Sequence, residues 1–174
     1  MITSHPASWT EEELLAHCRW TFSRASGPGG QNRNKVETSA QIEFVPAGIA
    51  ATASERRTQN ENRKVALQRL RCKLAVEYCL ASPIELEAMQ PHPSECWNRY
   101  CRSGRVKISE TNFDWPILLA EIMALLRTND WSLSSVAIRL QTTSSQLVRL
   151  LKQYAPAMTK LNAERGSRGH RPLE

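Results

Sequence analysis

Residues 26–35 read Ser-Gly-Pro-Gly-Gly-Gln-Asn-Arg-Asn-Lys, and the rest of the chain is expected to carry this stretch. Positions 27–30 hold three glycines and one proline. Neither a helix nor a paired strand is expected to continue there, because glycine loses the most backbone entropy on ordering and proline lacks an amide donor. The stretch is therefore predicted to be a protruding loop, in which Gly29 and Gly30 expose backbone N–H groups.

The loop offers dipoles rather than a titrating base. Gln31 carries a neutral amide that both donates and accepts hydrogen bonds. No His, Cys, Asp or Glu lies between Arg24 and Val36. We therefore expect any catalysis here to work by placing a water molecule and by donating to a developing oxyanion. A bare Gly-Gly-Gln is also typical of an ordinary turn between strands, and the patterns of phosphate-binding loops are absent.

The segments beside the loop have the periodicities of a small sheet and a helix. Residues 18–23 and 40–45 alternate as strands do, residues 46–48 contain a Pro-Ala-Gly turn signal, and residues 49–53 return as a third strand. A helix is predicted over 58–80, with an apolar face of Ala66, Leu67, Leu70, Leu74 and Tyr78 and with Lys64, Gln68 and Arg71 facing outward. Thr10 followed by three glutamates indicates a short capped helix.

Positive charge is concentrated around the predicted loop and helix. The 174 residues have a formal net charge of +6, and residues 19–73 alone hold 11 basic and 4 acidic side chains. This distribution favours an anionic partner such as nucleic acid, although a solvated polar helix face has the same composition. Five cysteines without a C-x-x-C pair indicate a reducing compartment, and the spacing of His92, Cys96 and Cys101 matches no common zinc module. We expect no metal and no cofactor. Neither a signal peptide nor a membrane helix is apparent.

Prolines 83, 91 and 93 indicate a boundary, after which the pattern is helical. Asp114 is expected to cap a helix with Pro116 in its first turn and Ile117, Leu118, Ile122, Leu125 and Leu126 on its apolar face. Residues 132–140 and 144–154 are typical of a helix-turn-helix, but a plain helical packing module fits the same pattern. The end of the chain is polar and basic.

A longer string identifies a family resemblance. Residues 23–42 read SRASGPGGQNRNKVETSAQI, followed by Pro-Ala-Gly-Ile at 46–49 and ERRTQNENRKVAL at 55–67. These residues resemble the signature of class I peptide chain release factors and related ribosome-rescue hydrolases, over about residues 18–80. The resemblance implies an α+β fold in which one long helix packs on a small antiparallel sheet with a protruding GGQ loop. The chain would comprise a catalytic domain at 1–83, a linker or docking segment at 84–112 and an all-helical region at 113–174.

The resemblance also implies a reaction, the hydrolysis of the peptidyl-tRNA ester in the peptidyl-transferase centre of the large ribosomal subunit. Gly29 and Gly30 would shape the loop, and the backbone N–H of Gln31 would stabilise the oxyanion or leaving group. Gln31 would also be the target of a glutamine methyltransferase. Support of the loop would come from Ser26, Gly27, Pro28, Asn34 and Lys35. Contacts to ribosomal RNA would come from Arg33, Arg56, Arg57, Arg63, Lys64 and Arg71.

Only about 17 residues precede the first predicted strand, whereas a stop-codon-reading release factor has a codon-recognition domain ahead of its catalytic domain. We therefore expect codon-independent release, by a cytoplasmic monomer. The competing interpretation is a non-enzymatic RNA- or DNA-binding protein that uses the basic helix and the helix-turn-helix-like region.

Overall fold

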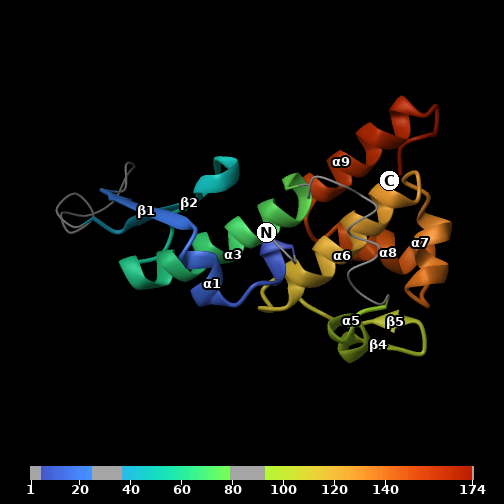
Figure 1. Ribbon diagram of the computed structural model, residues 1–174, viewed down its shortest axis with the longest axis horizontal. Coiled ribbons are helices and arrows are strands. Elements are labelled where there is room, and N and C mark those ends of the chain that lie inside the picture. The colour runs from blue at the N-terminus through green and yellow to red at the C-terminus, as the bar shows by residue number, and fades with distance from the viewer. Residues whose placement is uncertain (1–4, 25–36, 79–92, 174) are drawn as a thin grey trace. The chain divides into compact units, whose positions relative to one another are not determined.

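The structure, a computed structural model, describes residues 5–24, 37–78 and 93–173 (Figure 1). The chain forms two compact units. The sheet unit comprises residues 9–74, and the helical unit comprises residues 1–8 and 75–174. Helix α3 (Gln59–Glu77) supplies residues to both. The boundary predicted at about residue 83 lies outside the described residues.

The sheet unit is built on three antiparallel strands in the order β1 (Cys18–Ser23), β2 (Ser39–Phe44) and β3 (Ile49–Ala53). This confirms the predicted small antiparallel sheet. Trp20 lies opposite Ile42, which lies opposite Ala51. A 3-10 turn, η2 (Val45–Ala47), joins β2 to β3 and ends at Gly48 with φ 65°. That left-handed conformation favours glycine, as the turn signal predicted.

The core of the sheet unit lies between one face of the sheet and one side of α3. Every second residue of β2 is fully buried, beginning at Ala40, and the predicted helix positions Ala66, Leu67, Leu70 and Leu74 are buried as well. Side chains of α3 also donate to strand or loop carbonyls, among them those of Asn62, Arg69 and Lys73. Full burial of a leucine contributes about 1.5–3 kcal/mol, so the apolar stripe supplies much of this attachment.

The predicted short helix before the sheet is confirmed as α1 (Glu11–Leu15). The backbone N–H and the hydroxyl of Thr10 both donate to the Glu13 carboxylate at 2.9 Å, and the Glu13 N–H donates to the Thr10 hydroxyl at 3.3 Å. These bonds, led by the Thr10 backbone N–H, lower the pKa of Glu13. The reciprocal capping fixes where the helix begins and lets Leu14 enter the core.

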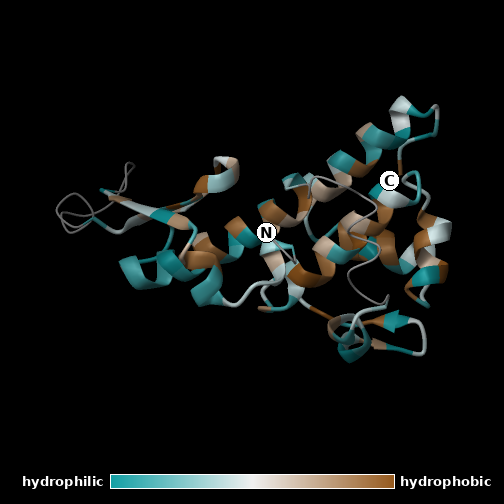
Figure 2. Cartoon of the chain, viewed as in Figure 1, coloured by the Kyte–Doolittle hydropathy of each residue, from teal (hydrophilic) through white to brown (hydrophobic). Residues whose placement is uncertain are grey.

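The helical unit is organised around α6 (Trp115–Thr128), most of whose side chains are buried. Before it come η1 (Pro6–Ser8), α5 (Glu95–Tyr100) and the two-residue strands β4 (Cys101–Arg102) and β5 (Arg105–Val106). After it come α7 (Leu133–Arg139), α8 (Ser144–Leu151) and α9 (Ala155–Ser167). Figure 2 shows brown, hydrophobic residues along α6 and teal, hydrophilic residues along much of α9. Of the predicted α6 face, Leu118, Ile122, Leu125 and Leu126 are buried and Ile117 is half-buried.

Asp114 caps α6 by its position, as predicted, but not through its side chain. Asp114 occupies the N-cap position, and Pro116 lies in the first turn as predicted, but the carboxylate makes no cap bond. Its Oδ2 instead accepts from Arg99 Nη1 at 2.9 Å and from the Tyr100 hydroxyl at 2.8 Å. These two donors come from α5, and one is charged, so they outcompete a neutral backbone N–H.

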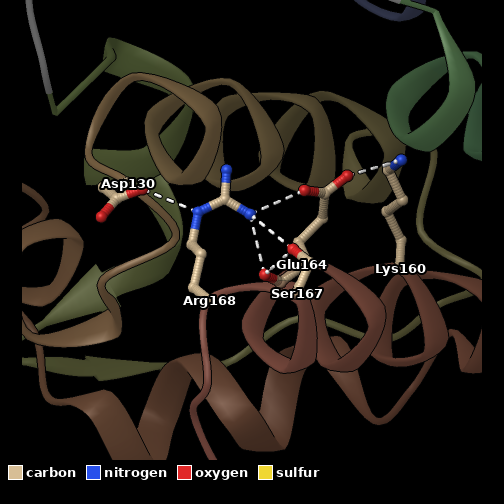
Figure 3. Close-up of polar contacts among 5 residues, drawn as sticks. All are labelled: Asp130, Lys160, Glu164, Ser167 and Arg168. Carbon is tan, nitrogen blue, oxygen red and sulfur yellow. Dashed lines mark hydrogen bonds and ion pairs between the residues drawn. The ribbon is translucent and has the colours of Figure 1, made fainter.

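Polar contacts fasten the end of α9 to the connection between α6 and α7 (Figure 3). Arg168 donates from Nε to Asp130 Oδ1 at 2.7 Å and from Nη1 to Glu164 Oε2 at 2.8 Å, while Lys160 pairs with Glu164 at 2.9 Å. Bonds from Lys160 and then Arg168 lower the pKa of Glu164. Such exposed pairs contribute only about 0–1 kcal/mol each, so their effect is to fix positions.

Within the described ranges, no helix is both long and apolar enough to cross a membrane.

Candidate catalytic loop and its supports

The predicted catalytic loop lies outside the described residues, from Ser26 through Gly29, Gly30 and Gln31 to Lys35. The predicted RNA contact Arg33 lies there too. Their roles therefore stay predictions. The structure does describe the frame that carries the loop, namely the facing ends of β1 and β2 and the first turns of α3.

The two strand ends that carry the loop are direct neighbours. β1 and β2 are paired up to Ser23, which lies opposite Ser39. Directly opposed residues in an antiparallel pair have their Cα atoms about 4.5–5.5 Å apart. The chain therefore leaves the sheet and returns to it at the same place, which limits where the loop can project.

Helix α3 holds the returning end of the loop through two amide side chains. Asn62 Nδ2 donates to the Thr38 carbonyl at 2.7 Å, and Gln59 Nε2 donates to the Glu37 carbonyl at 2.8 Å. These carbonyls belong to the last residues before β2. The backbone immediately after the loop is thus fixed by α3 as well as by the sheet.

The Asn62 carboxamide has three hydrogen bonds and is fully buried. Besides its bond to Thr38, Nδ2 donates to the Arg56 carbonyl at 3.1 Å and Oδ1 accepts from the Arg56 N–H at 2.9 Å. A buried amide is stable only with such partners. Asn62 therefore joins the start of α3, the turn before it and the end of the loop.

A second capping arrangement fixes the beginning of α3. The Glu61 carboxylate accepts from the Thr58 hydroxyl at 2.7 Å and from its backbone N–H at 3.2 Å, while the Glu61 N–H donates back to that hydroxyl. The hydroxyl bond is the main cause of the lowered pKa of Glu61. This local arrangement sets the register in which Asn62 faces inward.

The outgoing end of the loop is supported by an aromatic pair covered by arginine. The rings of Trp20 and Phe22 lie nearly parallel, at 6°, with centroids 5.9 Å apart. The guanidinium carbon of Arg63 lies 5.0 Å from the Trp20 ring centroid and 5.9 Å from that of Phe22. A cation over an aromatic face is favourable by about 0.5–1 kcal/mol at an exposed site. Neighbouring residues of α3, Asn62 and Arg63, thus contact the backbone that follows the loop and the strand that precedes it.

The basic residues of α3 and the turn before it differ in how far the fold engages them; Arg63 is exposed but lies over the Trp20 and Phe22 rings. Arg69 donates to the Thr52 carbonyl and pairs with Glu55, and Lys73 donates to the Ala50 carbonyl. These two side chains are engaged in the fold. In the described part of the chain, Arg56, Arg57 and Lys64 are exposed and their side chains form no ion pair or hydrogen bond. These three form the predicted RNA-contacting surface that the structure leaves accessible.

The prediction that Arg71 faces outward is wrong. Arg71 is fully buried, and its guanidinium donates to the carbonyl of Trp9. The long side chain reaches past the apolar stripe to a backbone carbonyl before α1, a contact that no local pattern in α3 reveals. Because a buried guanidinium cannot reach a phosphate, Arg71 does not belong to the RNA-contacting set.

The thiol of Cys18 is not activated. Cys18 lies on β1, and burial raises its pKa to about 11. A thiol with so high a pKa is almost entirely protonated near neutral pH and is a poor nucleophile.

Asn62, Gln59, Trp20 and Phe22 were not assigned a role from the sequence. One signal was present for Asn62, since asparagine is unfavourable inside a helix unless its side chain has a local or tertiary partner. Trp20 and Phe22 share one face of a strand that leads into the loop, which also could have been noticed.

The helix-turn-helix-like pair is confirmed as a pair of helices, α7 and α8. The hydroxyls of Ser132 and Thr143 cap them, accepting from Ser135 N and Gln146 N. Gln141, between the helices, has φ 51°. The predicted packing positions Ala137, Leu147 and Leu150 are buried.

The family profile described as RF-1 domain matches residues 13–108, more than half of the chain. The chain belongs to the RF-1 domain family. This match begins within α1, includes the whole sheet, the loop and α3, and ends just after β5.

Individual peptide chain release factors are similar to parts of this chain. The chloroplastic peptide chain release factor PrfB1 of Arabidopsis thaliana is 50% identical over 56 residues, 32% of this chain and 12% of the relative. Peptide chain release factor 1 of Chlorobaculum tepidum is 51% identical over 64 residues, 37% of this chain and 17% of the relative. Peptide chain release factor 2 of Haemophilus ducreyi is 35% identical over 89 residues, which are 51% of this chain and 24% of the relative. The chain thus matches less than a quarter of the length of these relatives.

Proposed function

We propose that this chain hydrolyses the ester bond of peptidyl-tRNA in the peptidyl-transferase centre of the large ribosomal subunit. The observation that carries the proposal is the frame around Gly29, Gly30 and Gln31. Strands β1 and β2 pair up to Ser23 and Ser39, and α3 contacts the backbone that follows the intervening loop and the strand that precedes it. A loop that acts by geometry needs such a fixed base. Membership of the RF-1 domain family supports the same reaction.

In the proposed reaction, a water oxygen attacks the ester carbonyl carbon, and the bond to the ribose 3′ oxygen breaks. The ribose oxygen takes up a proton, and the peptide leaves as a carboxylic acid. The backbone N–H of Gln31 would donate to the charge that develops on oxygen, and its side chain would place the water. One preorganised donor of this kind typically contributes about 3 kcal/mol to lowering a barrier.

Binding to the ribosome is proposed to use the exposed cations Arg56, Arg57 and Lys64. They lie at the start of α3, close in sequence to Asn62 and Gln59, which hold the loop end. Phosphate contacts of this kind supply affinity and orientation without reading sequence. The same region of the chain would therefore both bind ribosomal RNA and aim the loop.

We further propose that release does not require a stop codon. The similarity to release factors covers 12–24% of the length of the three relatives compared, and the family match spans residues 13–108, which include the glycine loop. The helical unit from α6 onward lies beyond the family match. We expect this protein to act on stalled ribosomes in the cytoplasm, with Gln31 as the target of a glutamine methyltransferase.

The test is peptide release from ribosomes that carry labelled formylmethionyl-tRNA in the peptidyl site. Three complexes are compared, with a stop codon, a sense codon or no messenger in the decoding site. The expected result is release from all three, with puromycin reactivity confirming that each ester is accessible. Release only at a stop codon would overturn codon independence, and no release from any complex would overturn the hydrolase.

The α7–α8 pair is the observation that supports the alternative function, an RNA- or DNA-binding protein without hydrolase activity. The release assay separates the two functions, because a binding protein would occupy the ribosome and leave the ester intact.

A further inference from the structure

The helical unit has a basic surface of its own, which we call the hairpin surface. Residues 99–107 contain four basic and no acidic side chains, and residues 131–163 contain no acidic side chain at all. The structure brings exposed bases of these two segments onto neighbouring elements, the β4–β5 hairpin and helix α8. The hairpin surface consists of Arg102, Arg105, Lys107, Arg149 and Lys152.

Three hydrogen bonds hold the hairpin against α8 and the turn before it. The Thr142 hydroxyl donates to the Gly104 carbonyl at 2.7 Å, at the tip of the hairpin. Val106 is held twice, because its N–H donates to Gln146 Oε1 at 3.4 Å and its carbonyl accepts from Arg149 Nη2. The bases on the two segments are therefore presented on one fixed support.

The hairpin places like charges against each other. Arg102 and Arg105 are directly opposite across the two strands, joined by a turn in which Ser103 has φ 48° and Gly104 has φ 76°. Like charges at opposed positions are destabilising. Within the described part of the chain, Arg102, Arg105 and Lys107 form no ion pair that would relieve the repulsion. An anion bound from outside would do so.

We propose that the hairpin surface binds the phosphate backbone of RNA. Fixed, uncompensated cations with exposed hydroxyls beside them, here Ser103 and Ser145, are the groups that contact nucleic-acid backbones. The choice of RNA over DNA rests on the proposed function, which brings this chain to ribosomal RNA. The helical unit thereby gains a role of its own, a second RNA contact in addition to the cations at the start of α3.

The test measures binding of the full chain to a fluorescein-labelled RNA hairpin of about 20 base pairs, by anisotropy over a series of potassium chloride concentrations. The variant R102Q/R105Q is compared with K160Q/R171Q, which removes the same charge from the same unit. At about 0.1 M salt we expect R102Q/R105Q to bind roughly tenfold more weakly, with a salt slope less steep by about 2. The control K160Q/R171Q is expected to bind like the wild type. R105K, which keeps the charge, should retain affinity and shows that the hairpin tolerates substitution.

Equal affinities of the two double variants would overturn the proposal. Tighter binding of the wild type to a DNA duplex of the same sequence would also overturn it. If R102Q/R105Q lost as much affinity for polyglutamate as for RNA, the surface would instead fit an acidic protein partner, which would overturn it as well. This assay contains no ribosome and no ester. If the wild-type chain releases no peptide but R102Q/R105Q still binds the RNA hairpin more weakly, the proposed hydrolase activity is wrong and the proposed phosphate-binding surface stands.

Discussion

Asn62 of α3 donates a 2.7 Å hydrogen bond to the carbonyl of Thr38, the residue immediately before β2. The bond spans 24 positions of sequence and connects the start of the long helix to the end of the Gly-Gly-Gln loop. A fully buried carboxamide thus contributes to stability and to loop position at the same time.

Asn62→Ala is expected to lower both the stability of the sheet unit and the rate of peptide release. Removing the carboxamide leaves the carbonyls of Thr38 and Arg56 and the Arg56 N–H without a partner, at a cost of about 1–3 kcal/mol. Urea unfolding measures the first effect, and single-turnover release at saturating protein measures the second. Asn60→Ala, on the exposed side of the same helical turn, is the control and should change neither quantity. Identical release by both variants would show that Asn62 only stabilises the fold.

Arg63→Lys distinguishes stacking from phosphate binding at one position. Lysine keeps the positive charge but lacks the planar guanidinium that lies over Trp20 and Phe22. We expect the free energy of unfolding to fall by about 0.5–1 kcal/mol while ribosome affinity changes little. Lys64→Arg, next to it and exposed, serves as the control. A loss of ribosome affinity without a loss of stability would mean that Arg63 acts mainly on RNA.

The exposed cations Arg56, Arg57 and Lys64 and the buried Arg71 should respond in opposite ways. Replacing Arg56, Arg57 and Lys64 with glutamine is expected to reduce the salt slope of ribosome binding by about 3 and to leave stability unchanged. Arg71→Gln should instead destabilise the sheet unit by about 1–3 kcal/mol, because it removes a buried charged hydrogen bond to Trp9, and it should leave the salt slope unchanged. Sedimentation with ribosomes and urea unfolding measure the two quantities. An Arg71 variant with normal stability would contradict the buried position.

Gly30→Ala is expected to slow peptide release at least as much as Gln31→Ala, although glycine has no side chain to contribute. If the Gln31 N–H stabilises the developing charge, its placement depends on backbone freedom at Gly30 that an added methyl restricts. A loss of about 3 kcal/mol corresponds to roughly a hundredfold in rate. Single-turnover release is compared with ribosome binding, which both variants should retain. Release at the wild-type rate by Gly30→Ala would indicate an ordinary turn and favour the binding-protein alternative.

His5 should make the helical unit sensitive to acid. Burial is the main cause that lowers its pKa from 6.5 to about 4, with the charge of Arg127 adding to it and the Tyr78 carbonyl opposing it. Because the folded state holds the neutral form, this contribution to stability is complete above pH 6.5 and is lost as the pH falls toward 4. Its upper bound is about 3 kcal/mol. Thermal unfolding of the wild type and His5→Gln between pH 7 and 4 measures it, with His170→Gln, at an exposed site, as the control. A parallel pH dependence in all three proteins would exclude His5 as the cause.

Several elements were determined by the sequence itself, because their signals are local. The alternation of residues 18–23 and 40–44 reports which side of a strand faces the core, and the Pro-Ala-Gly turn sets the connection that brings β3 back beside β2. The spacing of Ala66, Leu67, Leu70 and Leu74 likewise defines one side of α3. Each of these patterns depends on residues a few positions apart, so composition and periodicity suffice.

Which partner each polar side chain takes was decided only by the tertiary structure. Arg71 and Lys64 belong to the same basic helix, yet one is buried against the Trp9 carbonyl and the other is exposed. Asp114 has the sequence context of a helix cap, but Arg99 and Tyr100 provide stronger donors. Arg102 and Arg149 are 47 positions apart and meet on one surface because Val106 binds α8. Periodicity predicts the face on which a side chain lies, whereas its hydrogen bonds depend on donors and acceptors that only folding brings within reach.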